Sequence, residues 1–310
     1  MKAAQLATYG EKDTIVIIET EKPKPASGYV LVAAQAAGVN PFDVSLRIGK
    51  YKEFIHLDLP ATLGSDVAGV VEELGEGVTG YEIGQEVYGM ANAVKGEGSY
   101  AEYTPVSVKQ LVAKPKSVDF VTAAALPLAG SSAYQGIVDH IGARSGQKIL
   151  IHGGAGGIGA LAIQIAKNSG AYVATTVSTD DIEYAKQLGA DEVIDYKTQD
   201  FSGSNVGYDA VFDTVGGETN KKSYPVLKRG GILVSMVDPF DEELVKETGI
   251  NYIQQTTVTS VEMLNKIAEF VDSGKLKVNV DKVFPLDQAA EALEYLKTGH
   301  PRGKVVLKIQ

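Results

Sequence analysis

The chain has 310 residues, of which 44% are hydrophobic, and this is enough for two domains with ordinary cores. Its 29 lysine and arginine residues against 39 aspartate and glutamate residues give a net charge of −10, and no basic run is present. This balance argues against a nucleic-acid partner and against binding to anionic membrane surfaces.

Cysteine is absent, which excludes disulfides, thiol nucleophiles and thiolate metal ligands. No apolar run approaches the roughly 20 residues of a membrane span. The opening MKAAQLATYG contains no signal-peptide core. We therefore expect a cytoplasmic protein without a membrane partner.

Residues 1 to about 120 are predicted to form many short β-strands. Strand-like runs occupy 15–18, 29–34, 66–73 and 85–88, and glycines punctuate the turns between them. Such a pattern is typical of a small β-barrel.

From Thr122 onwards, strands and helices are expected to alternate. The alanine-rich stretch 122–138 predicts a helix interrupted at Pro127, and Thr179 is the expected N-cap of a helix over 180–188. Another helix is expected at 221–227. Strands are expected at 149–151, 172–177, 192–195, 209–212 and 231–237. The alternation predicts a parallel, doubly wound sheet.

The last segment returns to a mixed pattern that we expect to pack on the N-terminal domain. Helices are predicted at 261–272 and 286–296, and strands at 278–284 and 303–309. The expected division is therefore a catalytic domain of 1–121 with 272–310, and a cofactor domain of 122–271.

The strongest local motif is a strand, a glycine turn and a helix in 148–166. Gly154, Gly156 and Gly159 fit G-x-G-x-x-G. The first glycine allows a sharp turn, the second allows the backbone to approach a pyrophosphate, and the third allows close helix packing. The helix N-terminus offers N–H groups to the anion. The predicted dinucleotide-binding residues are Gly154, Ala155, Gly156, Gly157 and Ile158.

The strand that follows the glycine helix indicates which dinucleotide is bound. An acidic residue that grips the 2′-hydroxyl of NAD is expected about 20 residues beyond the glycines, but 173–179 reads VATTVST. Thr176 or Ser178 stands in its place, and a hydroxyl can donate to a 2′-phosphate. This predicts NADP. The acids Asp180 and Asp181 follow, and we assign them to the helix dipole.

Segments across nearly the whole chain carry a resemblance to a known family. They are AAGVNPFDVSLRIGKY from Ala36, LGSDVAGVVEELGEGV from Leu63, SYAEY from Ser99, AAALPLAGSSAYQ from Ala123, HGGAGGIG from His152, LGADEVIDY from Leu188, FDTVGG from Phe212 and GHPRGKVVLKI from Gly299. The chain resembles the zinc-free, zeta-crystallin-type quinone oxidoreductases of the medium-chain dehydrogenase/reductase family and their enone-reductase relatives. The resemblance implies an α/β protein with a GroES-like β-barrel catalytic domain and a Rossmann domain.

The resemblance also implies that no catalytic zinc is bound. Zinc-dependent members carry a cysteine where this chain has Asn40, and Gly-His-Glu where it has Gly64, Ser65 and Asp66. A catalytic zinc needs three protein ligands in near-tetrahedral reach, and these side chains are poor replacements. We expect no metal site.

The same comparison nominates Asn40 and Tyr51 as catalytic residues. The Asn40 amide is expected to hydrogen-bond substrate oxygen or the nicotinamide ribose, and the alternative is that it holds the turn before Pro41. Tyr51 is expected to line the substrate pocket or to donate a hydrogen bond.

Further cofactor residues follow from the resemblance or from their place in the predicted sheet. Tyr196 is expected beside the 2′-phosphate, or is an ordinary strand-end tyrosine. Ser132 is expected near the nicotinamide, or is a small residue in a helix. Val215 and Ser235 follow strands of the sheet at its ligand-binding edge. Lys304 is a weaker assignment, and a solvated basic turn explains it more simply.

These expectations lead to an NADPH-dependent reductase of quinones or α,β-unsaturated carbonyls. Without zinc, no metal polarises a simple ketone, so an acceptor whose developing charge is already delocalised is favoured. The alternative is an NADPH-binding redox sensor or structural protein without turnover. The resemblance also predicts a homodimer, formed through 232–237 if this strand is an edge of the sheet.

Overall fold

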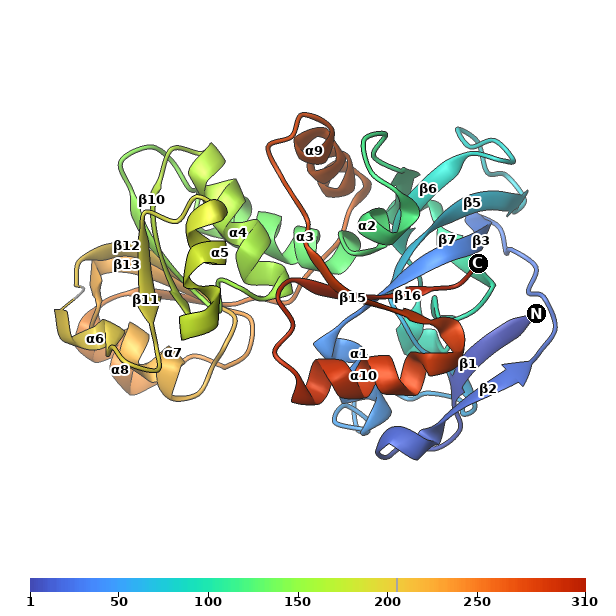
Figure 1. Ribbon diagram of the computed structural model, residues 1–310, viewed down its shortest axis with the longest axis horizontal. Helices are drawn as coiled ribbons and strands as arrows, with labels where there is room; N and C mark the ends of the chain where they lie inside the picture. Colours follow the sequence, from blue (N-terminus) through green and yellow to red (C-terminus); the bar gives the residue numbers. More distant parts are fainter. Residues whose placement is uncertain (205) are drawn as a thin grey trace. The chain divides into compact units, whose positions relative to one another are not determined.

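The structure is a computed structural model that describes residues 1–204 and 206–310, and the chain divides into two compact units (Figure 1). The first unit contains Met1–Leu128, Thr259–Gly274 and Val278–Gln310, and the second contains Ala129–Val258 and Lys275–Lys277. These bounds differ from the expected ones because two helices, α2 (Phe120–Ala124) and α9 (Val261–Asp272), belong with the first unit.

Specific contacts hold these helices in the first unit. A Cβ on Gly38 would lie 2.4 Å from the carbonyl oxygen of Ala124, so α2 lies directly on the strand that carries Gly38. The hydroxyl of Tyr88 donates to the carbonyl of Leu264 in α9 at 2.6 Å. Both contacts are long-range, and the local sequence around 122 and 261 carries no sign of either.

The first unit is built on two β-sheets. The larger sheet has the order β15-β16-β3-β5-β6-β8, with β7 also paired to β3. Its strands are β15 (Val280–Pro285), β16 (Lys304–Lys308), β3 (Tyr29–Val39), β5 (Asp66–Leu74), β6 (Glu86–Met90), β8 (Leu111–Ala113) and β7 (Tyr103–Ser107). The smaller sheet has β2 (Ile15–Glu19), β1 (Lys2–Leu6) and β4 (Ala61–Thr62). Because β16 pairs antiparallel with β3, the end of the chain returns to the N-terminal strands, as expected.

The remaining helices of this unit are α1 (Pro41–Arg47) and α10 (Ala289–Thr298), with short 3-10 turns at Lys12–Thr14, Ala93–Lys95, Val108–Gln110 and Leu286–Gln288. Asn40 precedes α1 in an extended conformation, and Pro41 occupies the first helical position. The backbone N–H of Asn40 donates to Asp43 at 2.8 Å, which is one half of a capping box.

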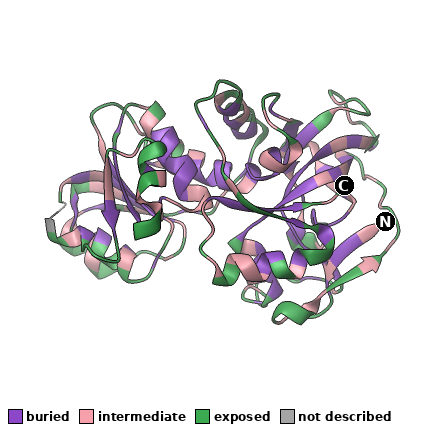
Figure 2. Cartoon of the chain, viewed as in Figure 1, coloured by how far each residue is buried: buried purple, intermediate pink, exposed green. Residues whose placement is uncertain are grey.

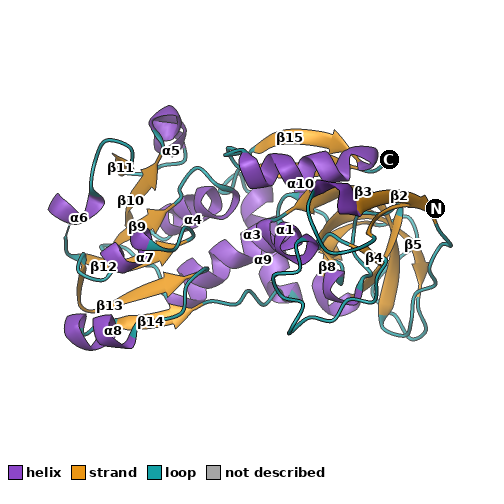
Figure 3. Ribbon diagram, turned by 90° about the horizontal axis from the view of Figure 1, so that it is seen from below, coloured by secondary structure: helices purple, strands orange, loops and turns teal. Residues whose placement is uncertain are grey.

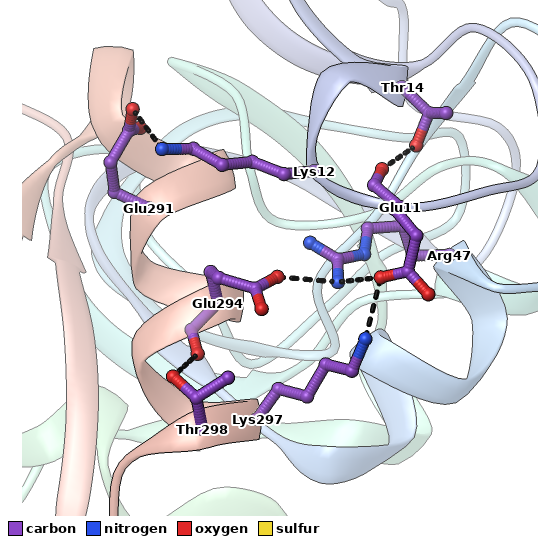
Figure 4. Close-up of polar contacts among 8 residues, drawn as sticks. All are labelled: Glu11, Lys12, Thr14, Arg47, Glu291, Glu294, Lys297 and Thr298. Carbon is purple, nitrogen blue, oxygen red and sulfur yellow. Dashed lines mark hydrogen bonds and ion pairs between the residues drawn. The ribbon is translucent and has the colours of Figure 1, made fainter.

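A buried arginine joins α1 to α10 (Figure 4). Arg47 is fully buried, and its Nη2 donates to Glu294 at 3.1 Å and lies 3.7 Å from Glu11. Glu11 also pairs with Lys297 at 2.6 Å. One guanidinium therefore connects α1 to α10 and to the residue that precedes the turn at Lys12–Thr14.

The second unit is a six-stranded parallel sheet in the order β11-β10-β9-β12-β13-β14, and Figure 3 shows the strands following one another in this order. They are β11 (Glu192–Asp195), β10 (Tyr172–Val177), β9 (Lys148–His152), β12 (Tyr208–Asp213), β13 (Leu227–Ser235) and β14 (Asn251–Gln254). The central strands are buried at almost every position (Figure 2), as their continuous apolar sequence predicts. The doubly wound expectation is confirmed.

The sheet order corrects the expected edge strand. Residues 232–237 are not at an edge, because β13 pairs with β12 on one side and with β14 on the other. The edges of this sheet are β11 and β14. The short NYIQ strand was not among the expected elements, since it has too few residues to show a period.

Helices of the second unit differ from the expected ones at two places. They are α3 (Pro127–Tyr134), which begins in the first unit, a π-helical turn at Gln135–His140, α4 (Gly157–Asn168), a 3-10 turn at Thr179–Asp181, α5 (Ile182–Gln187), α6 (Phe201–Ser204), α7 (Glu218–Ser223) and α8 (Glu242–Thr248). Thr179 is not a helix N-cap, because it lies inside the 3-10 turn and its hydroxyl donates to Asp195 at 2.7 Å. The helix expected at 221–227 begins earlier, since Gly217 has φ +62° and starts the helix at Glu218.

Candidate functional site

The glycine loop joins β9 to α4 with a geometry that only glycine permits at two of its positions. A Cβ on Gly154 would lie 2.0 Å from Thr175 Oγ1, and a Cβ on Gly159 would lie 2.2 Å from the carbonyl oxygen of Gly153. A Cβ on Gly156 would meet nothing closer than 3.4 Å. The space in front of Gly156 is therefore open.

This open face is what a pyrophosphate requires. Ala155, Gly156, Gly157 and Ile158 are all half-buried, so their backbone stays accessible. The first N–H groups of a helix have no partner inside it, and the first turn of α4 carries no acidic residue to compete for them. The loop fits the phosphates of a dinucleotide through its backbone and the helix dipole.

A buried histidine supports this loop from below. His152 Nδ1 and Nε2 each lie 3.0 Å from a hydroxyl, that of Thr176 and that of Ser223 respectively. The Ser223 hydroxyl donates its own proton to the carbonyl of Thr219 at 2.6 Å, so Nε2 carries the imidazole hydrogen and Nδ1 accepts from Thr176. Burial lowers the pKa of His152 to about 4, which keeps the ring neutral.

The contact with His152 bears on the prediction that the Thr176 hydroxyl donates to a 2′-phosphate. Thr176 is buried, and its oxygen also accepts the N–H of Gly153 at 3.4 Å. Its hydroxyl is therefore committed to the glycine loop. Ser178 is half-buried just beyond the end of β10, so of the two hydroxyls it stays the candidate for contact with a 2′-substituent.

One carboxylate contacts Ser178 directly, and a second contacts its neighbour Thr179. The Ser178 hydroxyl donates to Asp181 at 2.7 Å. Asp195, at the end of the adjacent strand β11, accepts from Thr179 at 2.7 Å, and this hydrogen bond holds the pKa of Asp195 below its usual range. Tyr196 is 54% exposed beside them, and its N–H donates to Val177 at 3.1 Å. This backbone hydrogen bond places Tyr196 next to the end of β10, and its contact with a 2′-phosphate stays a prediction.

The ends of β12 and β13 are organised by Asp213, which sequence reasoning did not single out. One oxygen of Asp213 accepts the N–H groups of Val215 and Gly216 at 2.9 and 3.0 Å. The other accepts from Asn220 at 2.8 Å and from Ser235 at 3.3 Å. The Val215 side chain stays half exposed, whereas Ser235 is buried. The only signal in the sequence was an aspartate that ends an apolar strand just before Thr-Val-Gly-Gly.

Ser132 is also buried, within α3. Its Oγ lies 2.7 Å from Thr257 Oγ1, and its carbonyl accepts from Gln255 at 2.9 Å. These contacts fix the residue against the chain that follows β14.

In the first unit, Lys304 is buried, which overturns its reading as a solvated basic turn. It is 5% exposed, and its Nζ lies 3.5 Å from Asp66 Oδ2 and donates to the carbonyl of Val39 at 3.2 Å. It also donates to Asn40 Oδ1. The antiparallel pairing of β16 with β3 places it here, because Val305 is opposite Val39.

Asn40 bridges the lysine and the carboxylate. Its Nδ2 donates to Asp66 Oδ2 at 2.9 Å, while its Oδ1 accepts from Lys304. The other oxygen of Asp66 accepts the N–H of Leu128 at 2.8 Å. Burial raises the pKa of Asp66, and the charge of Lys304 opposes this shift. The orientation of the Asn40 amide is therefore set by charged groups on both sides.

A second buried carboxylate lies next to this group. Asp43 accepts the Asn40 N–H and, at 2.9 Å, the hydroxyl of Tyr100. Burial raises the pKa of Asp43 to about 7 and raises that of Tyr100 well above its usual value. Tyr51, the other catalytic candidate, is half-buried with its ring centroid 5.9 Å from that of Phe42.

Among residues 1–204 and 206–310, no group of three or more histidine, cysteine, aspartate or glutamate side chains is arranged to hold a metal ion. Over the same ranges, no helix has both the length and the apolar character needed to cross a membrane.

Family models and curated relatives match residues in both units of the chain. Family models described as "Alcohol dehydrogenase GroES-like domain" and "Zinc-binding dehydrogenase" match residues 26–116 and 188–307. The chain is 38% identical to a 2-methylene-furan-3-one reductase of Solanum lycopersicum over 99% of its own length and 79% of the relative's. It is 37% identical to an NADPH-dependent alkenal/one oxidoreductase of Arabidopsis thaliana over the same shares.

Solved structures resemble this chain over its whole length. A quinone oxidoreductase from Coxiella burnetii is 34% identical with a TM-score of 0.93, over 100% of this chain and 99% of the other. The Escherichia coli quinone oxidoreductase complexed with NADPH is 26% identical with a TM-score of 0.91, over 100% of both chains.

Proposed function

Because the chain belongs to the quinone oxidoreductases of the medium-chain dehydrogenase/reductase family, we propose that it is an NADPH-dependent reductase of α,β-unsaturated carbonyls or quinones. The observation that carries the proposal is the glycine loop, whose open face at Gly156 precedes the N-terminus of α4. Relatives named for NADPH and for alkenals support the cofactor and the acceptor class.

The residues of the second unit are suited to hold the cofactor along one edge of the sheet. Bound NADPH supplies the hydride, while the protein supplies position and electrostatics. The loop from Gly154 to Ile158 binds the pyrophosphate, and Ser178 and Tyr196 lie at the 2′-phosphate. Val215 is presented by the loop that Asp213 orders. Ser132 and Ser235 shape the surroundings from buried positions.

In the first unit, we assign Asn40 and Tyr51 to the substrate. The Asn40 amide has two N–H groups, one of which bonds Asp66. We propose that the second donates to a carbonyl oxygen of the substrate, which gains negative charge in the reaction. Lys304 is buried beside Asn40 and donates to the Oδ1 of the same amide, which fixes the amide's orientation. Lys304 thus acts through Asn40 in this arrangement, and its expected contact with the cofactor stays a prediction.

We further propose that turnover does not require zinc. The argument is the chemistry of the donor set. Asp66 is already neutralised by Lys304 and accepts from Asn40 and the Leu128 backbone, so a divalent cation would have to displace an ammonium ion. An amide and a serine hydroxyl are weak zinc ligands. A conjugated acceptor needs no Lewis acid as strong as zinc, because its developing enolate or hydroquinone anion is delocalised.

We also propose a homodimer, with its contact moved from the expected strand 232–237 to the edge strand β14. An edge strand presents unpaired N–H and C=O groups that a second copy can pair with. A monomeric mass at micromolar concentration would contradict this proposal.

The proposed reaction is tested by following the loss of nicotinamide absorbance with a 2-alkenal, a cyclic enone and an ortho-quinone. NADPH should be consumed with at least one acceptor, and a chelator should leave the rate unchanged. Saturable NADPH binding without consumption would favour the alternative, a redox sensor or structural protein.

A matched pair of glycine variants tests the cofactor site itself. Gly156→Ala has room in the fold, so its melting temperature should match wild type while its affinity for NADPH falls by about tenfold or more. Gly203→Ala is the control, because Gly203 is exposed in α6 and its Cβ would meet nothing within 4 Å. Equal NADPH affinity in the two variants would contradict the assignment.

A further inference from the structure

The end of β10 carries a serine where an NAD-binding fold carries an acid, yet a carboxylate still reaches this place. β10 ends at Val177, and Ser178 follows it. Asp181 lies in the 3-10 turn just beyond, and the Ser178 hydroxyl donates to its Oδ2 at 2.7 Å. Asp181 therefore places a carboxylate next to the position where an NAD-binding fold has its own acidic residue.

This hydrogen bond changes what Ser178 can offer to a ligand. A hydroxyl has one proton to donate, and here the proton is given to Asp181. The neighbouring hydroxyl of Thr179 is likewise given to Asp195. A 2′-phosphate that arrives at Ser178 meets an engaged donor with a carboxylate behind it. A ribose 2′-hydroxyl, in contrast, can donate to that carboxylate.

The charges facing this position come from two neighbouring elements. Asp181 and Asp180 lie on the turn after β10, and Asp195 ends β11. Lys197 follows Tyr196 directly in the chain, and its backbone N–H donates to Asp195 at 2.9 Å. A carboxylate in contact with Ser178 is a group that a phosphate dianion would have to approach against its charge.

We propose that Asp181 sets the nucleotide preference of this chain by accepting from the ribose hydroxyl of NADH and opposing the 2′-phosphate of NADPH. NADPH binds with Ser178 turned away from Asp181, and its advantage over NADH is small as a result. The reaction that uses these nucleotides is the one proposed above, but the binding preference does not depend on it.

The test measures binding without turnover. Dissociation constants of 2′,5′-ADP and 5′-AMP are determined by calorimetry for wild type and for Asp181→Asn, which keeps the shape and removes the charge. We expect Asp181→Asn to tighten 2′,5′-ADP roughly tenfold relative to 5′-AMP, as one carboxylate against a phosphate about 6 Å away implies in a watery environment. The ratio of kcat/KM for NADPH and NADH should move in the same direction.

The control variant is Glu183→Gln, which makes the same change in net charge. Glu183 is exposed on α5 and paired with Lys186 at 2.7 Å, so its loss should leave the ligand ratio near the wild-type value. Ser178→Ala should reduce the gain from Asp181→Asn, because the hydroxyl that the substitution releases is missing.

The proposal is overturned if Asp181→Asn leaves the ratio of dissociation constants unchanged, or if Glu183→Gln shifts it equally. It stands if the ratio shifts in Asp181→Asn alone, even in a protein that reduces no acceptor. That last result would refute the reductase and leave the assignment of Asp181 intact.

Discussion

Replacing Lys304 by methionine should destabilise the first unit far more than the loss of an ordinary surface lysine. Lys304 is 5% exposed and Asp66 is fully buried, and the two side chains lie 3.5 Å apart. Methionine matches the length of the lysine stem but leaves the carboxylate without its counter-charge. Breaking a buried ion pair from one side costs about 3–5 kcal/mol, and Asn40 also loses a donor to its Oδ1.

The measurement is urea unfolding followed by far-ultraviolet circular dichroism, since the chain has no tryptophan. Lys12→Met is the matched control, because Lys12 pairs with Glu291 at 3.2 Å while both side chains are about half exposed. An exposed pair of this kind contributes about 0–1 kcal/mol. The double variant Lys304→Met with Asp66→Asn should recover much of the loss, because no buried charge then lacks a partner.

The pH dependence gives a second check on the same argument. Burial already raises the pKa of Asp66 in the folded protein, and removing Lys304 raises this pKa further. A carboxyl whose folded-state pKa is raised stabilises the folded state while it is protonated and loses that contribution as pH rises. The deficit of Lys304→Met should therefore be small in acid and grow towards neutral pH. A cost below about 1 kcal/mol at pH ~7, or no recovery in the double variant, would refute the buried pair.

Three further substitutions follow from the same structure, each measured by denaturation across a pH series. Burial raises the pKa of Asp43 from 3.8 to about 7, so its stabilising contribution is full below pH ~4 and lost by pH ~7. Asp43→Asn should remove a decline of up to about 4 kcal/mol over that window. His152 titrates in the opposite sense, because burial lowers its pKa from 6.5 to about 4. Its contribution is present above pH ~6.5 and lost as pH falls, so His152→Gln should remove up to about 3 kcal/mol of acid sensitivity. Arg47→Met should cost about 2–3 kcal/mol at pH ~7, since it strips the partner from Glu294 and keeps only the apolar packing. A cost near zero would mean that the link between α1 and α10 is not important for stability.

The local sequence pattern was sufficient to predict much of the second unit. The glycine spacing, the apolar strand before it and the helix after it are all encoded within 148–166, so the loop was predictable from neighbouring residues alone. The parallel sheet followed from the alternation of elements. The prediction that 232–237 forms an edge strand was wrong because β14 pairs with β13 on its far side. β14 has only four residues, too few to show a period in the sequence.

The roles of individual polar side chains depended on contacts between distant positions. Thr176 and Ser178 look equivalent in the sequence, yet they differ once His152, 24 residues before Thr176, takes up the Thr176 hydroxyl. Asp181 looked like a helix-dipole residue, and the structure turns its carboxylate onto Ser178.

By itself, the sequence predicted the α/β architecture and a dinucleotide loop from periodicity and short motifs, and it predicted the family through its resemblance to known members. Only the tertiary structure decided the state of Lys304. The antiparallel pairing of the last strand with β3 brings this lysine against Asn40, 264 residues earlier in the chain. Burial there removes water from both partners, so an ion pair that would contribute little on the surface becomes a determinant of the fold and of the amide beside it.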